Sequence, residues 1–264
     1  MNISRLGRSV KRALIATTLL ASSNAYAVIV PADILWLIDV SASMGNDINQ
    51  IRTRIGEFET AMNDNGIDAN YGLVEFGGNV DGAGNDWQTV TDMTSNFATF
   101  TAGLNSIGAT HGNPEDGTSA GLFGLNNISW NSGHVQNLIL VTDEDDDSDG
   151  NISFTATCQG GSRANCKAFD DELTAQNALF NVIRQPLAGN TTNTYDYLAA
   201  EHGGTAFSIA LFRSNPDDFF TNFINTKVKE IKDSVPAIPV PAAFWLFGTA
   251  LVGLIGFGKR RKAA

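Results

Sequence analysis

An uninterrupted apolar segment near the start of the chain places the strongest constraint on the fold. Residues 34–38 read ILWLI and lead directly into Asp39. Because no polar residue alternates with the apolar ones, this pattern predicts a strand buried on both faces, which is typical of a parallel sheet covered by helices. We expect similar strands at residues 71–76, 135–141 and 206–210.

Between these strands, apolar residues recur at spacings of three and four, as they do in amphipathic helices. Helices are therefore expected at residues 47–62, 97–107, 114–125, 170–183 and 217–231. One further strand is expected between residue 183 and Thr205, at a position that the pattern does not define. Strands that alternate with helices predict an α/β fold with a doubly wound, mostly parallel sheet flanked by helices.

Both ends of the 264-residue chain differ in character from the segment between them. Residues 1–27 combine a basic start, a short apolar run and a small-x-small ending, which indicates a secretory signal peptide; the alternative, a membrane-spanning helix, needs a longer run. Residues 234–241 form a Pro-rich linker. In residues 242–264, an apolar stretch precedes four consecutive basic residues, which favours a membrane span with the body outside the cytoplasm.

The charge of the segment between the two ends excludes some classes of partner. Eight of the 17 basic residues lie in the terminal segments, which contain no acidic residue, so nine basic residues face 28 acidic ones in the body. Such a surface repels phosphates, so we expect no nucleic acid among the partners. It is suited to divalent cations or to basic partners.

A set of oxygen-bearing side chains directly follows the first predicted strand. Asp39, Ser41 and Ser43 form a D-x-S-x-S pattern, and Asp143 comes shortly after the strand at 135–141. The carboxyl ends of parallel strands meet at one edge of a sheet, where ligands bind. A carboxylate and two hydroxyls are the hard ligands that Mg²⁺ prefers. The alternative is a turn whose Asp and Ser only cap the following helix.

Two other segments carry candidate features. Cys158 and Cys166 are the only cysteines, and in an exported protein such a pair indicates a local disulfide rather than two free thiols. Asp145, Asp147 and Asp149 match the first half of a calcium-binding loop, but Ala156 stands where the full loop has a bidentate Glu. The hypothesis is a second cation site for Ca²⁺, and the alternative is a solvated acidic loop.

The sequence offers no pattern of catalytic residues. Its histidines are His111, His134 and His202, and they form no H-E-x-x-H motif. A G-x-S-x-G nucleophile elbow and a phosphate-binding loop are also missing from the sequence. We therefore expect a protein that is not an enzyme.

The site residues and their order resemble those of the von Willebrand factor A (vWA) family, a Rossmann-like fold, over about residues 33–232; we assign residues 28–233 to this domain. The resemblance implies a metal-ion-dependent adhesion site in which the first loop supplies Asp39, Ser41 and Ser43 and the third loop supplies Asp143. In the second loop, Pro114-Glu115-Asp116-Gly117 resembles a Pro-Glu variant of the family and points to Glu115. The alternatives in that loop are Asn113 and Thr110.

The resemblance also implies what the site would bind. The cation would be Mg²⁺, with Mn²⁺ or Ca²⁺ as alternatives. In this family the metal keeps an open position that a carboxylate of the partner completes. The partner would therefore be a protein or a polysaccharide that offers a carboxylate.

The tail resembles a PEP-CTERM-type sorting signal of the V-P-x-P-A-A-x-W-L-F-G variant. Residues 238–248 match every fixed letter except the first, where Ile238 replaces valine. The N-terminal pattern predicts cleavage by signal peptidase, and the resemblance of the tail implies processing by an exosortase, with an inner-membrane intermediate. The body would then reach the cell surface or extracellular matrix of a Gram-negative bacterium; the alternative is a plain membrane anchor.

These observations lead to two hypotheses of function. The first is an exported surface or matrix-associated protein that binds a partner through its metal-dependent adhesion site. The second is an assembly or structural factor of the envelope or exopolysaccharide, in which the metal is only structural.

Overall fold

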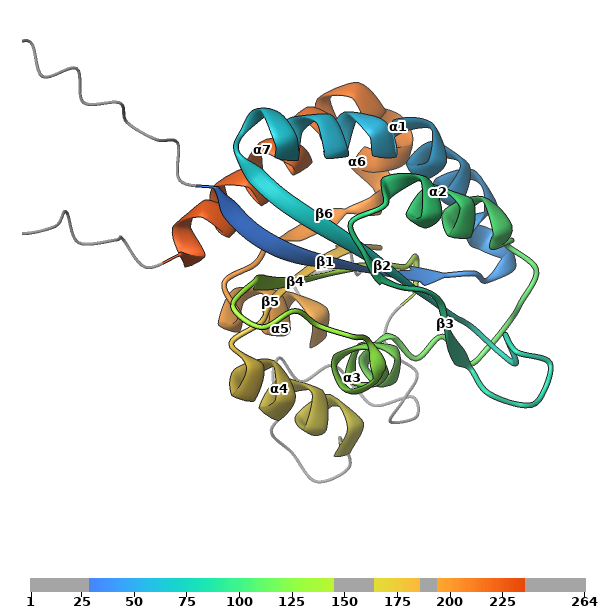
Figure 1. Ribbon diagram of the computed structural model, residues 1–264. Coiled ribbons are helices and arrows are strands. Elements are labelled where there is room, and N and C mark those ends of the chain that lie inside the picture. The colour runs from blue at the N-terminus through green and yellow to red at the C-terminus, as the bar shows by residue number, and fades with distance from the viewer. Residues whose placement is uncertain (1–28, 145–163, 186–193, 236–264) are drawn as a thin grey trace, which may run out of the picture.

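A six-stranded sheet forms the centre of the computed structural model, which describes residues 29–144, 164–185 and 194–235 (Figure 1). The strand order is β3-β2-β1-β4-β5-β6, and every neighbouring pair is parallel except β2 and β3. The strands are β1 (Val30–Asp39), β2 (Ile67–Phe76), β3 (Trp87–Thr94), β4 (Val135–Val141), β5 (Leu179–Arg184) and β6 (Ala206–Ser208).

Helices cover both faces of this sheet. On one face lie α1 (Gly45–Asp64), α2 (Phe97–Ser106), α6 (Ile209–Ser214) and α7 (Pro216–Ser234), with a short 3-10 turn, η1 (Ala42–Met44), before α1. On the other face lie α3 (Gly117–Asn127), α4 (Ala164–Gln176) and α5 (Thr194–Glu201). This three-layer arrangement confirms the expected doubly wound, mostly parallel α/β fold.

The predicted first strand is buried on both faces, as its composition requires. Side chains of β1 alternate between the two cores, so that Trp36 faces α1 and α7 while Leu35 and Leu37 face α3. Trp36 contacts Phe58 edge to face at 5.5 Å between ring centroids, and Phe58 lies 5.8 Å from Phe223 of α7. Aromatic contacts of this kind add to the apolar burial that holds the two helices on the sheet.

One expected helix, at residues 170–183, is wrong in its position. Helix α4 ends at Gln176, and Asn177 adopts a left-handed conformation with a φ of 52°. That conformation commonly ends a helix. The strand β5 then begins at Leu179, so the strand that was expected after residue 183 lies before it. A short apolar run does not distinguish a buried strand from a helix by periodicity, which explains the error.

The structure also differs from the expectations in one missed strand and in the bounds of two other elements. The antiparallel edge strand β3 was not expected, because its half-exposed polar residues lack an apolar run. Helix α3 begins at Gly117 rather than at 114, because the Asp116 side chain caps it by accepting from the Ser119 amide at 2.7 Å. The last strand stops at Ser208, where Ile209 begins α6.

Several expectations concern residues outside the described ranges. The signal peptide at 1–27, the sorting tail at 242–264 and most of the linker belong to them. Within residues 29–144, 164–185 and 194–235, no helix combines the length and apolarity that a membrane span needs.

Candidate metal centre

Two neighbouring strands, β1 and β4, place the candidate site at their carboxyl ends. From β1 the chain passes to β2 on one side, whereas β4 lies on the other side of β1 and begins the second half of the sheet. The sheet therefore has its topological switch point between these two strands. Asp39 is the last residue of β1, and Asp143 follows β4 by two residues. Ligands of open α/β sheets bind at such a point.

Asp39 is held rigidly at the base of the site, with 0% of its surface exposed. One carboxylate oxygen, Oδ1, accepts from the Ser41 amide at 2.7 Å, and the other, Oδ2, accepts from the Thr142 hydroxyl at 2.7 Å. Burial raises the pKa of Asp39 above its ordinary value, the bonds from Ser41 and Thr142 lower it, and the charge of Asp143 raises it. A carboxylate that is shielded from solvent and lies near a second acid is destabilised in its charged form, and a bound cation would offset that destabilisation.

The two predicted serines connect the first loop with the third. Ser41 Oγ lies 3.0 Å from Ser43 Oγ, and the Ser43 hydroxyl donates to Asp143 Oδ1 at 2.9 Å. Four residues that the sequence pattern singled out, Asp39, Ser41, Ser43 and Asp143, are thus brought together from two loops. They offer hard oxygen atoms only, which is the chemistry that Mg²⁺, Mn²⁺ or Ca²⁺ requires.

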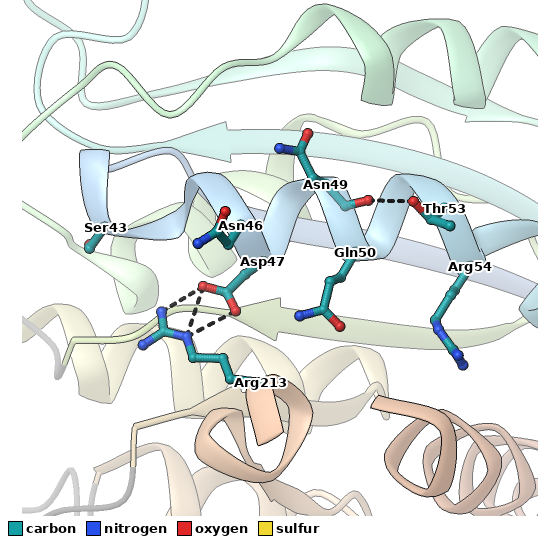
Figure 2. A pocket seen from close by; sticks show the side chains of 8 residues that line it. All are labelled: Ser43, Asn46, Asp47, Asn49, Gln50, Thr53, Arg54 and Arg213. Atoms are coloured by element: carbon teal, nitrogen blue, oxygen red, sulfur yellow. Dashed lines mark hydrogen bonds and ion pairs between the residues drawn. The ribbon is translucent and has the colours of Figure 1, made fainter. Parts of the chain in front are cut away.

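An ion pair that was not predicted lies next to these residues. Arg213 of α6 donates from Nη2 to Asp47 Oδ2 at 2.5 Å, and its Nε lies 3.0 Å from Asp47 Oδ1 (Figure 2). The same Nη2 also donates to Asp143 Oδ2 at 2.7 Å. Asp47, in the first turn of α1, is fully buried. These contacts raise the pKa of Arg213 above its ordinary value, mainly through the bond to Asp47. The guanidinium therefore keeps a positive charge beside Asp143.

Sequence reasoning could not find Arg213, because it lies 166 residues from Asp47 and belongs to no motif. Asp47 carried a weak signal, since acids are favoured in the first turn of a helix. Thr142 directly precedes the predicted ligand Asp143, but its bond to Asp39 was not foreseen.

The second predicted loop lies against the first. The amides of Thr110 and His111 both donate to the Val40 carbonyl at 3.1 Å, and the Ala42 amide donates to the His111 carbonyl at 3.1 Å. These backbone bonds fix the loop beside Ser41, with which His111 forms an isolated parallel bridge. The loop is therefore in position to contribute to the site.

The three candidates within this loop have different surroundings. Glu115 is buried just before α3, whereas Thr110 and Asn113 are exposed. The backbone of Asn113 is close to Gly78, where an added Cβ atom would stand 2.2 Å from the Asn113 carbonyl oxygen. In the described part of the chain, no hydrogen bond joins the Thr110 or Asn113 side chain to Asp39, Ser41 or Asp143. Glu115 as the second-loop ligand stays a prediction.

The remaining site predictions fall at or beyond the edge of the described residues. Asp145, Asp147, Asp149 and Cys158 lie outside them. Cys166 is buried in α4 and is disulfide-bonded; its predicted partner is Cys158. Within the described residues, no three His, Cys, Asp or Glu side chains gather as a potential metal cluster. A cation at Asp39 and Asp143 would therefore depend on hydroxyls as well as on carboxylates.

Comparisons with known proteins give no family match and no similar curated protein. Solved structures do resemble the chain. The conserved hypothetical protein BatB from Bacteroides thetaiotaomicron is 13% identical, with 76% of this chain and 99% of BatB covered and a TM-score of 0.50. The pilus adhesin SpaC from Lactobacillus rhamnosus GG is 16% identical, and the match covers 77% of this chain and 31% of SpaC with a TM-score of 0.51. The SpRpn10 VWA domain is 13% identical, and the match covers 67% of this chain and 87% of that domain with a TM-score of 0.48.

At such low identities the likeness establishes the fold alone. The chain has the von Willebrand factor A fold. In this fold, the switch point between β1 and β4 carries Asp39 and Asp143, at the strand ends where the apolar pattern placed them.

Proposed function

We propose that this vWA domain binds an anionic partner through a divalent cation held by Asp39, Ser41, Ser43 and Asp143. The observation that carries the proposal is the unbroken set of oxygen contacts from Ser41 through Ser43 to Asp143, beside the buried Asp39 carboxylate. When bound, the cation would supply a positive charge that receives a carboxylate of the partner. The acidic body would otherwise repel such a partner.

The residues around the cation would have separate tasks. Thr142 orients Asp39 by donating to one of its oxygens, and Ser43 does the same for Asp143. Arg213 neutralises Asp47 below the site and holds the other oxygen of Asp143. Because these hydrogen bonds already hold the two carboxylates in place, little side-chain rearrangement would be needed when the cation binds.

We further propose that the protein acts at the cell surface or in the extracellular matrix. The signal-like and sorting-like ends support this location, and the pilus adhesin SpaC among the similar structures agrees with an adhesive role. Peptide mass spectrometry of the surface fraction should recover the body without residues 244–264. Recovery of the intact C-terminal peptide from that fraction would favour the plain membrane anchor.

A specific observation favours the alternative of a structural cation. Both oxygens of Asp143 accept bonds from the protein's own side chains, Ser43 and Arg213, so this acid is already held in place without a partner. In an assembly or structural factor, the cation would then stiffen the loops rather than receive a ligand. If the partner still binds after a chelator has removed the cation, this alternative is supported.

Calorimetric titration with Mg²⁺, Mn²⁺ and Ca²⁺ tests the proposal directly. The Asp39→Ala change removes the buried carboxylate, and we expect the affinity for the cation to fall at least about 100-fold, which corresponds to about 3 kcal/mol. The matched control is Asp68→Ala, which removes an exposed acid near the opposite end of β2. An Asp39→Ala variant that binds the cation like the Asp68→Ala control would end the adhesion-site proposal and leave only the fold.

A further inference from the structure

A groove with a volume of about 640 Å³ adjoins the candidate metal centre. Figure 2 shows the side chains that line it, with Ser43 among them. Its volume lies within the range of small-ligand sites, roughly 300–1,000 Å³. Ser43 belongs both to the groove and to the oxygen cluster around Asp39. Any ligand that places a carboxylate at the cation can therefore extend into this groove along α1.

The wall of the groove presents side-chain amides. Asn46 and Gln50 lie one helical turn apart on α1, and both line the groove. Neither amide has a hydrogen-bond partner among the described residues. Each can donate two hydrogen bonds and accept others. Thr53 continues the same wall with a hydroxyl group.

The acidic group at the floor of the groove, Asp47, is paired with an arginine. The Asp47 carboxylate is buried and paired with Arg213 through Nε and Nη2. The third guanidinium nitrogen, Nη1, makes no hydrogen bond within the described part of the chain. At the far end, Arg54 pairs with Asp217 and lies over the ring of Phe220. Both guanidinium groups already face carboxylates, since Arg54 also pairs with Glu57 and Arg213 with Asp143. They therefore offer a ligand N–H donors such as Nη1 rather than a net positive charge.

The composition of the groove argues against a peptide as its occupant. None of its lining side chains is aliphatic or aromatic. Peptides are commonly anchored by apolar side chains in pockets or by pairing with a strand edge, and this helix-walled groove provides neither. Adjacent sugar hydroxyls, in contrast, can both donate to and accept from amides such as those of Asn46 and Gln50.

We propose that this groove binds the hydroxyl-bearing units of an acidic polysaccharide whose carboxylate is received at the Asp39–Asp143 site. The proposal rests on the proposed function, because it assumes the cation there, and it narrows the partner from any carboxylate-bearing molecule to a polymer of uronic acid type. The saccharide would lie along α1, with hydroxyls on Asn46 and Gln50 and a further oxygen atom near Nη1 of Arg213.

The test uses three probes on the intact protein with Mg²⁺: a hexamer of galacturonic acid, a neutral hexamer of galactose and a hexamer of glutamic acid. We expect calorimetry to show binding of the galacturonate hexamer that a chelator abolishes, and weaker binding of both other probes. In the Asn46→Ala/Gln50→Ala variant, this affinity should fall about tenfold, because the hydrogen bonds from two side-chain amides to the sugar hydroxyls are lost. The affinity of that variant for Mg²⁺ alone should be unchanged.

The matched control is Asn63→Ala, which removes an exposed amide from the last turn of the same helix. Circular dichroism should show that every variant folds like the wild type. Galacturonate binding that is equal in the double variant and in the control overturns the inference. So does a glutamate hexamer that binds as tightly as galacturonate, since the partner would then be an acidic peptide while the metal-dependent function stands.

Titration with Mg²⁺ alone separates this inference from the function on which it rests. Wild-type protein that takes up no Mg²⁺ contradicts the proposed function. Galacturonate binding that persists in that case, and that still needs Asn46 and Gln50, would support the groove without the cation.

Discussion

The hydroxyl of Thr142 donates to Asp39 Oδ2 at 2.7 Å, and this bond joins the carboxyl end of β4 to that of β1. Both side chains are completely buried. The same hydroxyl oxygen accepts from the Glu144 amide at 3.1 Å, so it also fixes the loop that carries Asp143. Thr142 thus determines the relative position of the two acids in the candidate site.

Replacing this hydroxyl should weaken both the fold and the site. In Thr142→Val, the buried Asp39 carboxylate loses a donor, which costs about 1.5–3 kcal/mol for a bond to a charged group. We expect denaturant unfolding to show that loss of stability and calorimetry to show weaker cation binding. Thr142→Ser keeps the hydroxyl and should retain cation binding; if it binds as poorly as Thr142→Val, the hydrogen bond is not the cause.

The pair of Arg213 and Asp47 should be strongly coupled in stability. Arg213→Met leaves the buried Asp47 carboxylate without its charged donor. Because the Arg213 side chain is 36% exposed and water screens part of the interaction, we expect a loss of about 1–3 kcal/mol. Asp47→Asn combined with Arg213→Met should recover part of that loss. A double-mutant cycle from urea unfolding measures the coupling, and additive effects of the two changes would show that the pair does not act as a unit.

The second-loop ligand can be identified by a pair of variants. If Glu115 contributes a carboxylate to the cation, Glu115→Gln should lower the affinity for Mg²⁺ at least tenfold, equivalent to about 1.4 kcal/mol. Asn113→Ala removes an exposed amide from the same loop and should have little effect. The reverse result in calorimetric titration would make Asn113 the ligand, and no effect of either change would leave Thr110.

A buried lysine gives a prediction about the pH dependence of stability. Lys227 of α7 is fully buried, donates to Glu230 at 2.5 Å and lies 5.0 Å from the Phe207 ring centroid. Burial lowers the pKa of Lys227 from 10.5 to about 8. Between pH 8 and the unfolded pKa, the folded state has released this proton while the unfolded state still binds it. The free energy of unfolding therefore rises with pH over this range, because the penalty for burying the charged amine is removed. Above the unfolded pKa no further rise is expected from Lys227.

The Lys227→Met variant isolates this contribution. Between pH 8 and pH 10, the unfolding free energy of the wild type should rise relative to that of the variant by about 2 kcal/mol. Other groups titrate equally in both proteins, so the difference between the two curves is the measurement. Parallel curves would show that Lys227 keeps an ordinary pKa in the folded state.

The predicted disulfide can be tested on exported protein. Cys166 is buried in α4 and belongs to the apolar core that contains Phe169. If it is joined to Cys158, the closed loop should add about 2–3 kcal/mol of stability. Mass spectrometry without reductant should then find no alkylatable thiol, and adding a reductant should lower the unfolding temperature. Two alkylated cysteines in the untreated protein would contradict the pairing.

Local sequence patterns determined the central elements and the four oxygen-bearing residues of the candidate site. The apolar run before Asp39 predicts β1 because burial on both faces leaves no polar position, and the spacing of Ile48, Ile51 and Ile55 predicts α1 because only one face of that helix is buried. Asp39, Ser41 and Ser43 were visible because they follow one another in a single loop. The local pattern did not separate the end of α4 from the start of β5 at Leu179, because a short apolar run fits both a helix and a buried strand.

Only the tertiary structure decided which distant residues complete the site. The contacts of Thr142 with Asp39, and of Arg213 with Asp47 and Asp143, join segments separated by 70 to 166 residues. No periodicity encodes such pairs, because they arise when the parallel order of β1, β4 and β6 brings the ends of these strands to one edge of the sheet. The charge beside the candidate cation is therefore a property of the fold rather than of any local motif.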